Sequence, residues 1–170
     1  MAEGLTALVD EMQGRIGQES TPGDWMLVTQ DMVNQFADVT GDHQFIHVDP
    51  ERAKGTPFKG TIAHGFLTLS LCLTLPRYRQ SPTAAADAAP PPPTAGGNRP
   101  QMKMAVNYGL NRVRFPAPVP VGKHVRAKSK LVSVEAVAPD TLQSVTQITI
   151  EVEGSEKPAA VIELVGRQYY

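Results

Sequence analysis

The fold is decided by residues 36–75, which read FADVTGDHQFIHVDPERAKGTPFKGTIAHGFLTLSLCLTL. The first half of this stretch gathers carboxylates, histidines and glycines within a few turns of chain. The second half runs directly into a long apolar segment. Reactive polar groups at the mouth of an apolar element are typical of a small-molecule active site, so we expect the rest of the chain to act as its scaffold.

The composition is that of an ordinary globular protein. The chain has 170 residues, of which 41% are hydrophobic and 19% charged, and this suits one folded domain over residues 1–170. A formal net charge of −1 gives no general attraction to nucleic acid or to a membrane surface. The single cysteine, Cys72, excludes an internal disulfide and favours a reducing, cytoplasmic location, and the sequence contains no apolar run long enough to cross a bilayer.

Two helices are expected before the polar part of the stretch. Apolar residues recur at helical spacing over residues 5–16, which predicts a short amphipathic helix. A second helix is expected over residues 30–38, with Thr29 as its N-cap and Gly41 as its C-terminal cap. Asp42 is therefore predicted to lie on the tight loop that follows this helix.

Two further helices are expected in the remainder of the stretch. Asp49 as a cap and Pro50 in the first turn predict one helix start. Residues 61–75 are apolar on almost every side, which predicts a buried central helix that ends at Pro76. A strand also fits this locally alternating run, but its length favours the helix.

The C-terminal half changes to the period of two that is typical of strands. An insertion rich in Pro and Ala comes first, at residues 81–100, and we expect a flexible surface loop because its composition buries little apolar surface. Four strands are expected after it, over residues 102–115, 124–137, 141–153 and 158–169. The element order indicates an α+β architecture, with an antiparallel sheet that wraps the apolar helix.

Asp42 and His47 form the first candidate pair for chemistry, five residues apart across the predicted loop. A carboxylate and an imidazole held close together can share one water molecule. The carboxylate accepts a proton, while the imidazole donates one or orients the water. The alternative is purely structural: Asp42 caps the next turn, and His47 is a hydrogen-bonded loop histidine.

His64 and Gly65 fall at the start of the apolar segment. Backbone N–H groups at a helix start are unpaired and carry the positive end of the helix dipole, so they can stabilise a developing oxyanion. Gly65 has no side chain, which lets a thioester oxygen approach its N–H closely. The alternative is a glycine needed only for packing. For His64 we expect a hydrogen bond to backbone.

The same loop also carries candidate metal ligands. His43 and His47 are spaced H-x3-H, with Asp42 and Asp49 beside them, and on one helix face this spacing suits zinc. Gly41 and the dense polar loop argue against a continuous helix here. We therefore expect no metal.

These motifs resemble the signature of the MaoC-like dehydratase and R-specific enoyl-CoA hydratase family. The matching segments are Thr40-Gly41-Asp42, His47, Asp49-Pro50, Ile62-Ala63-His64-Gly65 and residues 107–119. The resemblance covers most of the chain apart from residues 81–100. It implies a hot-dog fold, in which an antiparallel sheet wraps a long central helix, and a homodimer with coenzyme A along the subunit interface. Arg112 and Arg114 would either meet coenzyme A phosphates or be solvated strand charges.

The resemblance also implies an activity. It is the reversible syn addition of water to a trans-2-enoyl-CoA thioester, giving the (3R)-hydroxyacyl product, in fatty-acid metabolism. By the same resemblance Asp42 is the base toward water, His47 orients the water and protonates the α-carbon, and the Gly65 N–H receives the thioester oxygen. The residues implied to contact the substrate are Gln44, Phe45 and His64. No cofactor is implied, because coenzyme A is part of the substrate.

One departure from the family pattern keeps other functions open. Members often carry Asn-Pro where this chain has Gln44-Phe45, and Gln44 retains an amide on a longer stem. One alternative is an acyl-CoA thioesterase on the same fold, and another is a non-catalytic module that binds acyl thioesters. The pairing of Asp42 with His47 favours the hydratase.

Overall fold

The structure is a computed structural model that describes residues 3–80 and 100–170. Helices occupy the N-terminal half, and the C-terminal half forms a single antiparallel sheet in the order β1-β3-β4-β5-β2. The α+β architecture expected from the sequence is therefore confirmed. Residues 81–99 of the expected insertion lie outside the described residues.

The helices lie close to where capping residues predicted them. In chain order they are α1 (Glu3–Gln13), α2 (Gln30–Thr40), α3 (Phe45–Val48), α4 (Pro50–Ala53) and α5 (Gly65–Ser70), and α5 continues into the 3₁₀ turns η1 (Leu71–Leu73) and η2 (Leu75–Arg77). The side chain of Thr29 accepts a hydrogen bond from the N–H of Met32, and Gly41 ends α2 in the left-handed conformation with φ of 78°. Both caps confirm the prediction. The one-turn helix α3 was not predicted.

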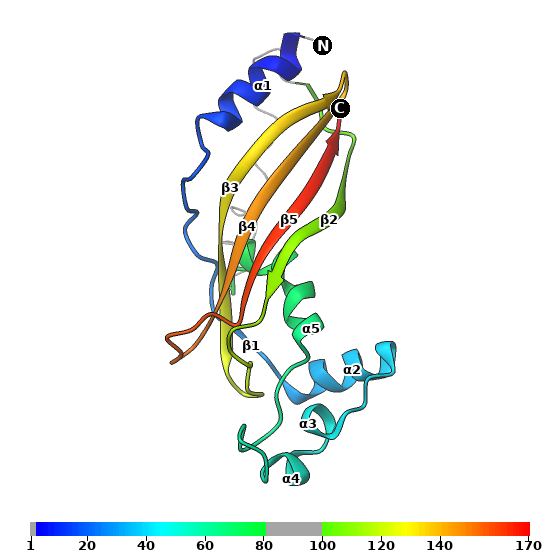
Figure 1. Ribbon diagram of the computed structural model, residues 1–170, viewed down its shortest axis with the longest axis vertical. Helices are drawn as coiled ribbons and strands as arrows, with labels where there is room; N and C mark the ends of the chain where they lie inside the picture. The colour runs from blue at the N-terminus through cyan, green and yellow to red at the C-terminus, as the bar shows by residue number, and fades with distance from the viewer. Residues whose placement is uncertain (1–2, 81–99) are drawn as a thin grey trace.

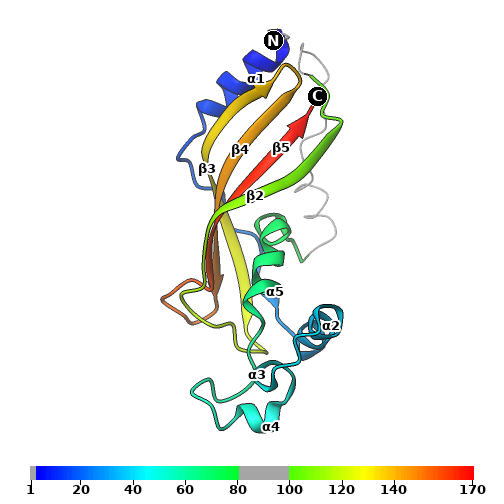
Figure 2. The same ribbon diagram turned by 45° about the vertical axis from the view of Figure 1, so that its right-hand side comes forward.

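Strands β2 to β5 match the four predicted segments within a few residues, and the two-residue β1 precedes them. They are β1 (Met26–Leu27), β2 (Met104–Arg114), β3 (His124–Ala138), β4 (Thr141–Val152) and β5 (Ala160–Tyr169). The sheet bends around α5, with α1 at one end of the molecule and α2 to α4 at the other (Figures 1 and 2). Leu67 of α5 and Leu75 of η2 pack on Ile150 and Ile162 of the sheet in the main core. Full burial of each such side chain is worth roughly 1.5–3 kcal/mol.

The central helix is shorter than the sequence suggested. We expected it over residues 61–75, but α5 begins only at Gly65. Residues 61–64 are extended because their backbone groups are used in tertiary pairing: the N–H of Ala63 donates to the carbonyl of Val119, and the N–H of Val121 donates to the carbonyl of Thr61. The expected bounds were therefore wrong, and the α-helical part has six residues.

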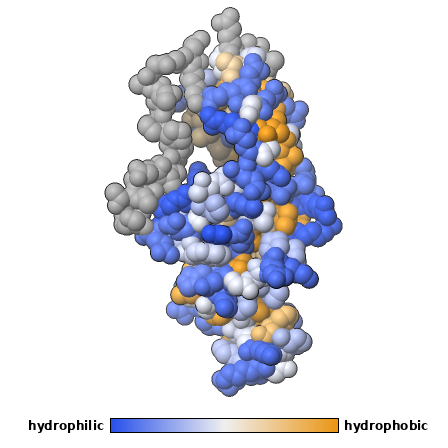
Figure 3. Space-filling view, turned by 90° about the vertical axis from the view of Figure 1, so that its left-hand side faces the viewer, coloured by the Kyte–Doolittle hydropathy of each residue, from blue (hydrophilic) through white to orange (hydrophobic). Residues whose placement is uncertain are grey.

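The two edges of the sheet differ in how they are covered. The edge of β3 is covered by β1 and by residues 17–23, whose backbone N–H groups donate to carbonyls of β3. This side of the molecule presents a largely hydrophilic surface (Figure 3). The other edge is β2, which is exposed along almost its whole length. Its exposed large apolar residues are Met104, Val106, Tyr108 and Leu110.

No helix among the described residues is long and apolar enough to cross a membrane.

Candidate active site

Asp42 lies on the loop between α2 and α3. Gly41 turns the chain out of α2, and Asp42 follows it on the surface. One carboxylate oxygen of Asp42 accepts a long hydrogen bond of 3.4 Å from the N–H of Gln44. The carboxylate is thus oriented by its own loop, as expected for an acidic residue beside a tight turn.

His47 is buried on the single turn of α3, and one of its ring nitrogens is committed to the backbone. Its Nδ1 lies 2.7 Å from the carbonyl oxygen of Ile62. A carbonyl only accepts, so Nδ1 carries the hydrogen. In the neutral ring Nε2 is then left with a lone pair. The tautomer of His47 therefore presents a proton acceptor, rather than a donor, at its free end.

A half-buried amide fixes the turn that carries His47. The Gln30 side chain on α2 donates from Nε2 to the carbonyl oxygen of His47 at 2.7 Å, and its Oε1 accepts a 2.6 Å hydrogen bond from the hydroxyl of Thr61. The N–H of Ile62 also donates to the carbonyl of Ile46. α2, α3 and the extended segment before α5 are thus joined at one point.

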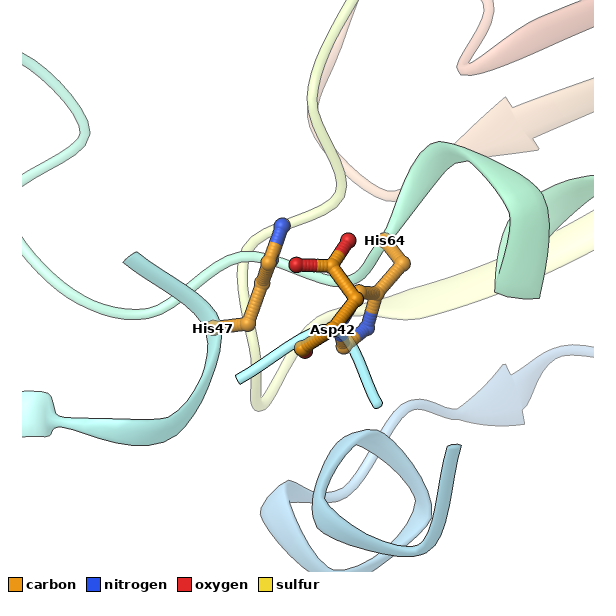
Figure 4. Close-up of side chains that lie close together, drawn as sticks. All are labelled: Asp42, His47 and His64. Carbon is orange, nitrogen blue, oxygen red and sulfur yellow. The ribbon is translucent and has the colours of Figure 1, made fainter. Parts of the chain in front are cut away.

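Three side chains meet at this point. A carboxylate oxygen of Asp42 and ring nitrogens of His47 and His64 all lie within 4.8 Å of one another. The Asp42 carboxylate stands beside the His47 ring, with the His64 ring close by (Figure 4). Two hydrogen bonds of about 2.8 Å each let one water molecule bridge groups at this separation. The Asp42 and His47 groups are therefore placed to hold a single water between them.

The same three side chains are poorly arranged for a metal ion. The rings of His47 and His64 are stacked, with centroids 3.8 Å apart and an angle of 25° between their planes. An imidazole binds a metal through a lone pair in its ring plane, at about 2 Å. Because the two ring planes are nearly parallel, a single ion cannot lie in both planes at that distance from both rings. The ligands of the H-x3-H alternative do not come together either. Nε2 of His43 lies 3.6 Å from a carboxylate oxygen of Asp38, while the Asp49 side chain caps α4.

Gly65 begins α5 directly after His64. Among the residues that the structure describes, no backbone or side-chain acceptor bonds the N–H of Gly65, as is usual for the first residue of a helix. The ring of Phe115 covers this position, and a Cβ added at Gly65 would lie 3.3 Å from two of its carbons. A side chain at this position would be tight against the Phe115 ring, so packing favours glycine here.

The other three residues predicted at the site are Gln44, Phe45 and His64, and they differ in burial. Gln44 is exposed, and Phe45 is half-buried with the guanidinium of Arg52 4.4 Å from its ring centroid. His64 is only 2% exposed and donates from Nε2 to the carbonyl oxygen of Asp42 at 2.9 Å. The predicted backbone hydrogen bond of His64 is thus confirmed. Its position beneath Asp42 and beside His47 was not foreseen.

An apolar pocket of about 290 Å³ lies near the far end of α5. Its walls come from α5, η1, β2 and β5, and the lining residues include Leu69, Cys72, Leu110 and Leu164. Burial raises the pKa of the Cys72 thiol, so this wall stays neutral and apolar. Asp42 and His47 do not line it. A rise of 1.5 Å per residue puts the pocket roughly 6–8 Å along the helix from Gly65.

Sequence reasoning missed the groups that hold the site together. Gln30 and Thr61 were assigned no role, although they are bonded to each other across 31 positions of the chain. A glutamine at a helix start and a threonine before an apolar segment are common features without a distinctive spacing. Only the packing of α2 against residues 61–64 reveals their contact.

Comparison with protein families points to one group of enzymes. A model described as MaoC like domain matches residues 11–77. The chain is 50% identical over 159 residues to 3-hydroxyacyl-thioester dehydratase Z of Mycobacterium tuberculosis (strain ATCC 25618 / H37Rv), covering 94% of each protein. It is also 40% identical over 150 residues to Nodulation protein N of Rhizobium leguminosarum bv. viciae, covering 88% of this chain and 83% of that protein.

Comparison with solved structures supports the same fold. The (R)-hydratase from A. caviae involved in PHA biosynthesis aligns with a TM-score of 0.63 at 23% identity, covering 89% of this chain and 94% of that one. A monoamine oxidase regulatory protein from an Archaeoglobus species aligns with a TM-score of 0.65 at 24% identity, covering 91% and 89%. The hot-dog fold expected from the sequence is confirmed by these alignments.

Proposed function

Because the chain belongs to the MaoC-like dehydratase family, we propose that it hydrates trans-2-enoyl-CoA thioesters reversibly to (3R)-hydroxyacyl-CoA. The family makes it a hydro-lyase of the thioester dehydratase type. The enoyl-CoA substrate and the R configuration are our proposal. One observation carries it: the Asp42 carboxylate and a His47 ring nitrogen lie within 4.8 Å, while Nδ1 of His47 is held by Ile62.

The proposed reaction uses one water molecule. Water donates one hydrogen bond to the Asp42 carboxylate and the other to Nε2 of His47, which leaves an oxygen lone pair for C3 of the substrate. His47 takes a proton as the C3–O bond forms, and the electron pair of the C2–C3 double bond moves onto the thioester as an enolate. The His47 imidazolium then returns the proton to C2. The hydrogen and the hydroxyl add to the same face.

This order of proton transfer differs in one respect from the order that the resemblance implies. There, Asp42 is the base and His47 donates to the α-carbon. The hydrogen bond from Nδ1 of His47 to Ile62 leaves the neutral ring with no hydrogen to donate at Nε2. His47 therefore first accepts the water proton that it later delivers, and Asp42 orients the water and stabilises the imidazolium.

We place the thioester oxygen at the N–H of Gly65. The negative charge of an enolate develops on this oxygen, and an unpaired N–H at the start of a helix stabilises such a charge. The contact of Phe115 explains the glycine by packing alone, so the assignment rests on the N–H at the start of α5, which is unpaired among the described residues. A thioester bound at this end directs the acyl chain along α5 toward the apolar pocket of about 290 Å³.

We also propose a homodimer formed through β2. An exposed, unpaired edge strand is a template for pairing with another chain, and proteins usually cover or interrupt such edges. Here the β3 edge is covered, while β2 exposes all of its residues except the half-buried Val113, with apolar side chains among them. A second copy is the occupant that we propose. Leu110 of β2 also lines the apolar pocket, so the interface would lie beside the substrate.

The reaction as written needs no further cofactor. Water supplies both the hydroxyl group and the proton, and coenzyme A enters and leaves with the substrate. With a coenzyme A thioester as substrate, we propose a role in fatty-acid metabolism. We also propose a cytoplasmic location, where the free thiol of Cys72 is stable.

The test is a spectrophotometric assay with crotonyl-CoA and longer enoyl-CoA thioesters. We expect loss of the enoyl absorbance with no release of free thiol. Release of coenzyme A would indicate the thioesterase alternative instead. Tight binding of the thioesters without turnover at any chain length would indicate the non-catalytic alternative, and either result would contradict the proposal.

A further inference from the structure

We propose that His64 is a positioning residue that fixes Asp42 and His47 relative to each other. The inference rests on the proposed function, because it assigns His64 a role in the same reaction. His64 does not present a hydrogen-bonding group to substrate in this arrangement. Its side chain is 2% exposed, and its Nε2 is bonded to the Asp42 carbonyl oxygen at 2.9 Å.

The hydrogen bond from His64 is the shortest one that Asp42 itself makes among the described residues. Its other two are local and longer: 3.5 Å from the N–H of Asp42 to the Thr40 hydroxyl, and 3.4 Å from the N–H of Gln44 to the Asp42 carboxylate. Bonds of this length are weak. The neighbours Gly41 and Gln44 are held by short backbone hydrogen bonds, but without His64 Asp42 itself would keep only these two long ones.

The ring of His64 supports His47 at the same time. The two rings stack with centroids 3.8 Å apart, and Phe36 of α2 packs against His64 at 5.0 Å. His47 is held by Ile62 through one ring nitrogen, so a second support against its ring face limits its tilt. One side chain thereby touches both groups that must share the water molecule.

The second ring nitrogen of His64, Nδ1, indicates that histidine occurs at this position for function and not for the stability of the fold. Nδ1 is buried without a hydrogen-bond partner among the described residues. A buried polar atom without a partner is unfavourable, so an apolar ring of similar shape would suit folding at least as well. The imidazole is therefore best explained by what its Nε2 does for Asp42.

Two variants separate the hydrogen bond from the ring. His64→Phe keeps a ring for stacking and removes the donor, whereas His64→Gln keeps an N–H donor and removes the ring. We expect His64→Phe to lower kcat by roughly tenfold to a hundredfold, since small misplacements of reacting groups have effects of this size. KM should stay within about threefold, because substrate contacts are unchanged. His64→Gln should retain more activity than His64→Phe.

A role in packing alone predicts the reverse order, because Phe resembles His in shape more closely than Gln does. Thermal unfolding of both variants, with Thr141→Val as a buried polar control far from the site, identifies any general loss of stability. Turnover of His64→Phe within threefold of the wild type, or above that of His64→Gln, would overturn the inference.

A double-mutant cycle tests whether His64 acts through Asp42. Adding His64→Phe to the Asp42→Asn variant should lower kcat by a much smaller factor than His64→Phe does in the wild type, because the group being positioned is already impaired. Additive losses would contradict the inference. If the wild type has no hydratase activity, the proposed function fails, and the inference is then judged by NMR.

The NMR experiment does not depend on activity. Long-range ¹H–¹⁵N spectra of the histidine rings at neutral pH report which nitrogen carries the hydrogen. We expect His64 to carry it on Nε2 and His47 on Nδ1. Hydrogen on Nδ1 of His64, alone or together with Nε2, would overturn the inference. An unchanged Asp42 amide signal in His64→Phe would do the same.

Discussion

At the scale of the residue, His47 and His64 show how surroundings give one side-chain type two roles. Each is buried, and each donates from one ring nitrogen to a backbone carbonyl. They differ in the nitrogen that remains. The free nitrogen of His47 is available for the water that we place beside Asp42, whereas that of His64 is enclosed without a partner among the described residues. The first can exchange a proton with a reactant, and the second can only hold its neighbours.

Removing either proposed catalytic group should abolish most turnover. We expect Asp42→Asn and His47→Gln each to lower kcat on the order of a hundredfold or more, which is the usual size of a general acid–base contribution. The measurement is steady-state hydration of crotonyl-CoA. His43→Gln is a matched control, because His43 is exposed one residue from Asp42 and faces Asp38. Full activity in both site variants would reject their assignment.

At the scale of the element, the site depends on short segments whose structure is set by tertiary contacts. The long elements could be predicted from local signals, such as the Thr29 cap, the left-handed Gly41 and the alternation along β4. The turn of α3 and the extended residues 61–64 could not. Their backbone groups pair with Gln30, Val119 and each other, and none of these partners is near them in sequence.

The same reason explains what was and was not foreseen at the site. Asp42 and His47 were found because they lie five residues apart in a loop of recognisable composition. The tautomer of His47 depends on Ile62, and the stacking of His64 depends on where α5 begins. Both contacts follow from the extended segment before α5. The length of the apolar segment favoured a helix there, so nothing in the sequence indicated these contacts.

The backbone of Gly23 lies in close contact with the backbone of η2, at the end of the helical region that begins with α5. Gly23, in the linker before β1, packs so tightly against η2 that an added Cβ would overlap the carbonyl oxygen of Leu75. We expect Gly23→Ala to reduce the free energy of unfolding by roughly 1–3 kcal/mol, because the linker or η2 must move. Urea denaturation measures this change.

Gly60→Ala is the matched control, since a Cβ there meets no heavy atom within 4 Å. Its stability should remain within about 1 kcal/mol of the wild type. Equal stability of the two variants would show that the approach of Gly23 to Leu75 is not a constraint.

At the scale of the whole molecule, the two halves of the chain contribute different parts of the site. The helical half holds the polar groups at the start of α5, and the sheet supplies an apolar wall along the rest of it. A smaller core, in which α1 covers Leu142, closes the opposite end of the sheet. The β2 edge and the exposed Phe66 and Phe115 remain uncovered in the single chain. In the proposed homodimer, a second copy of the chain would cover that surface.

The proposed dimer makes a prediction about β2. Val106→Lys places a charge on the exposed edge, and in a two-fold pairing of β2 strands it brings like charges near each other. We expect the wild type to sediment as a dimer and this variant to sediment as a monomer. Val132→Lys is the control, because Val132 is a similarly exposed valine on β3. A wild-type monomer, or dimers in all three proteins, would contradict the assignment.

The most direct test of the account is the stereochemistry of hydration in D₂O. One water between Asp42 and His47, with its proton returned by the same imidazole, requires both new bonds to form on one face of the enoyl thioester. NMR of the product from crotonyl-CoA should show deuterium at C2 and hydroxyl at C3 added syn, with the R configuration at C3. Anti addition, the S configuration, or deuterium distributed equally over both faces of C2 would contradict the account.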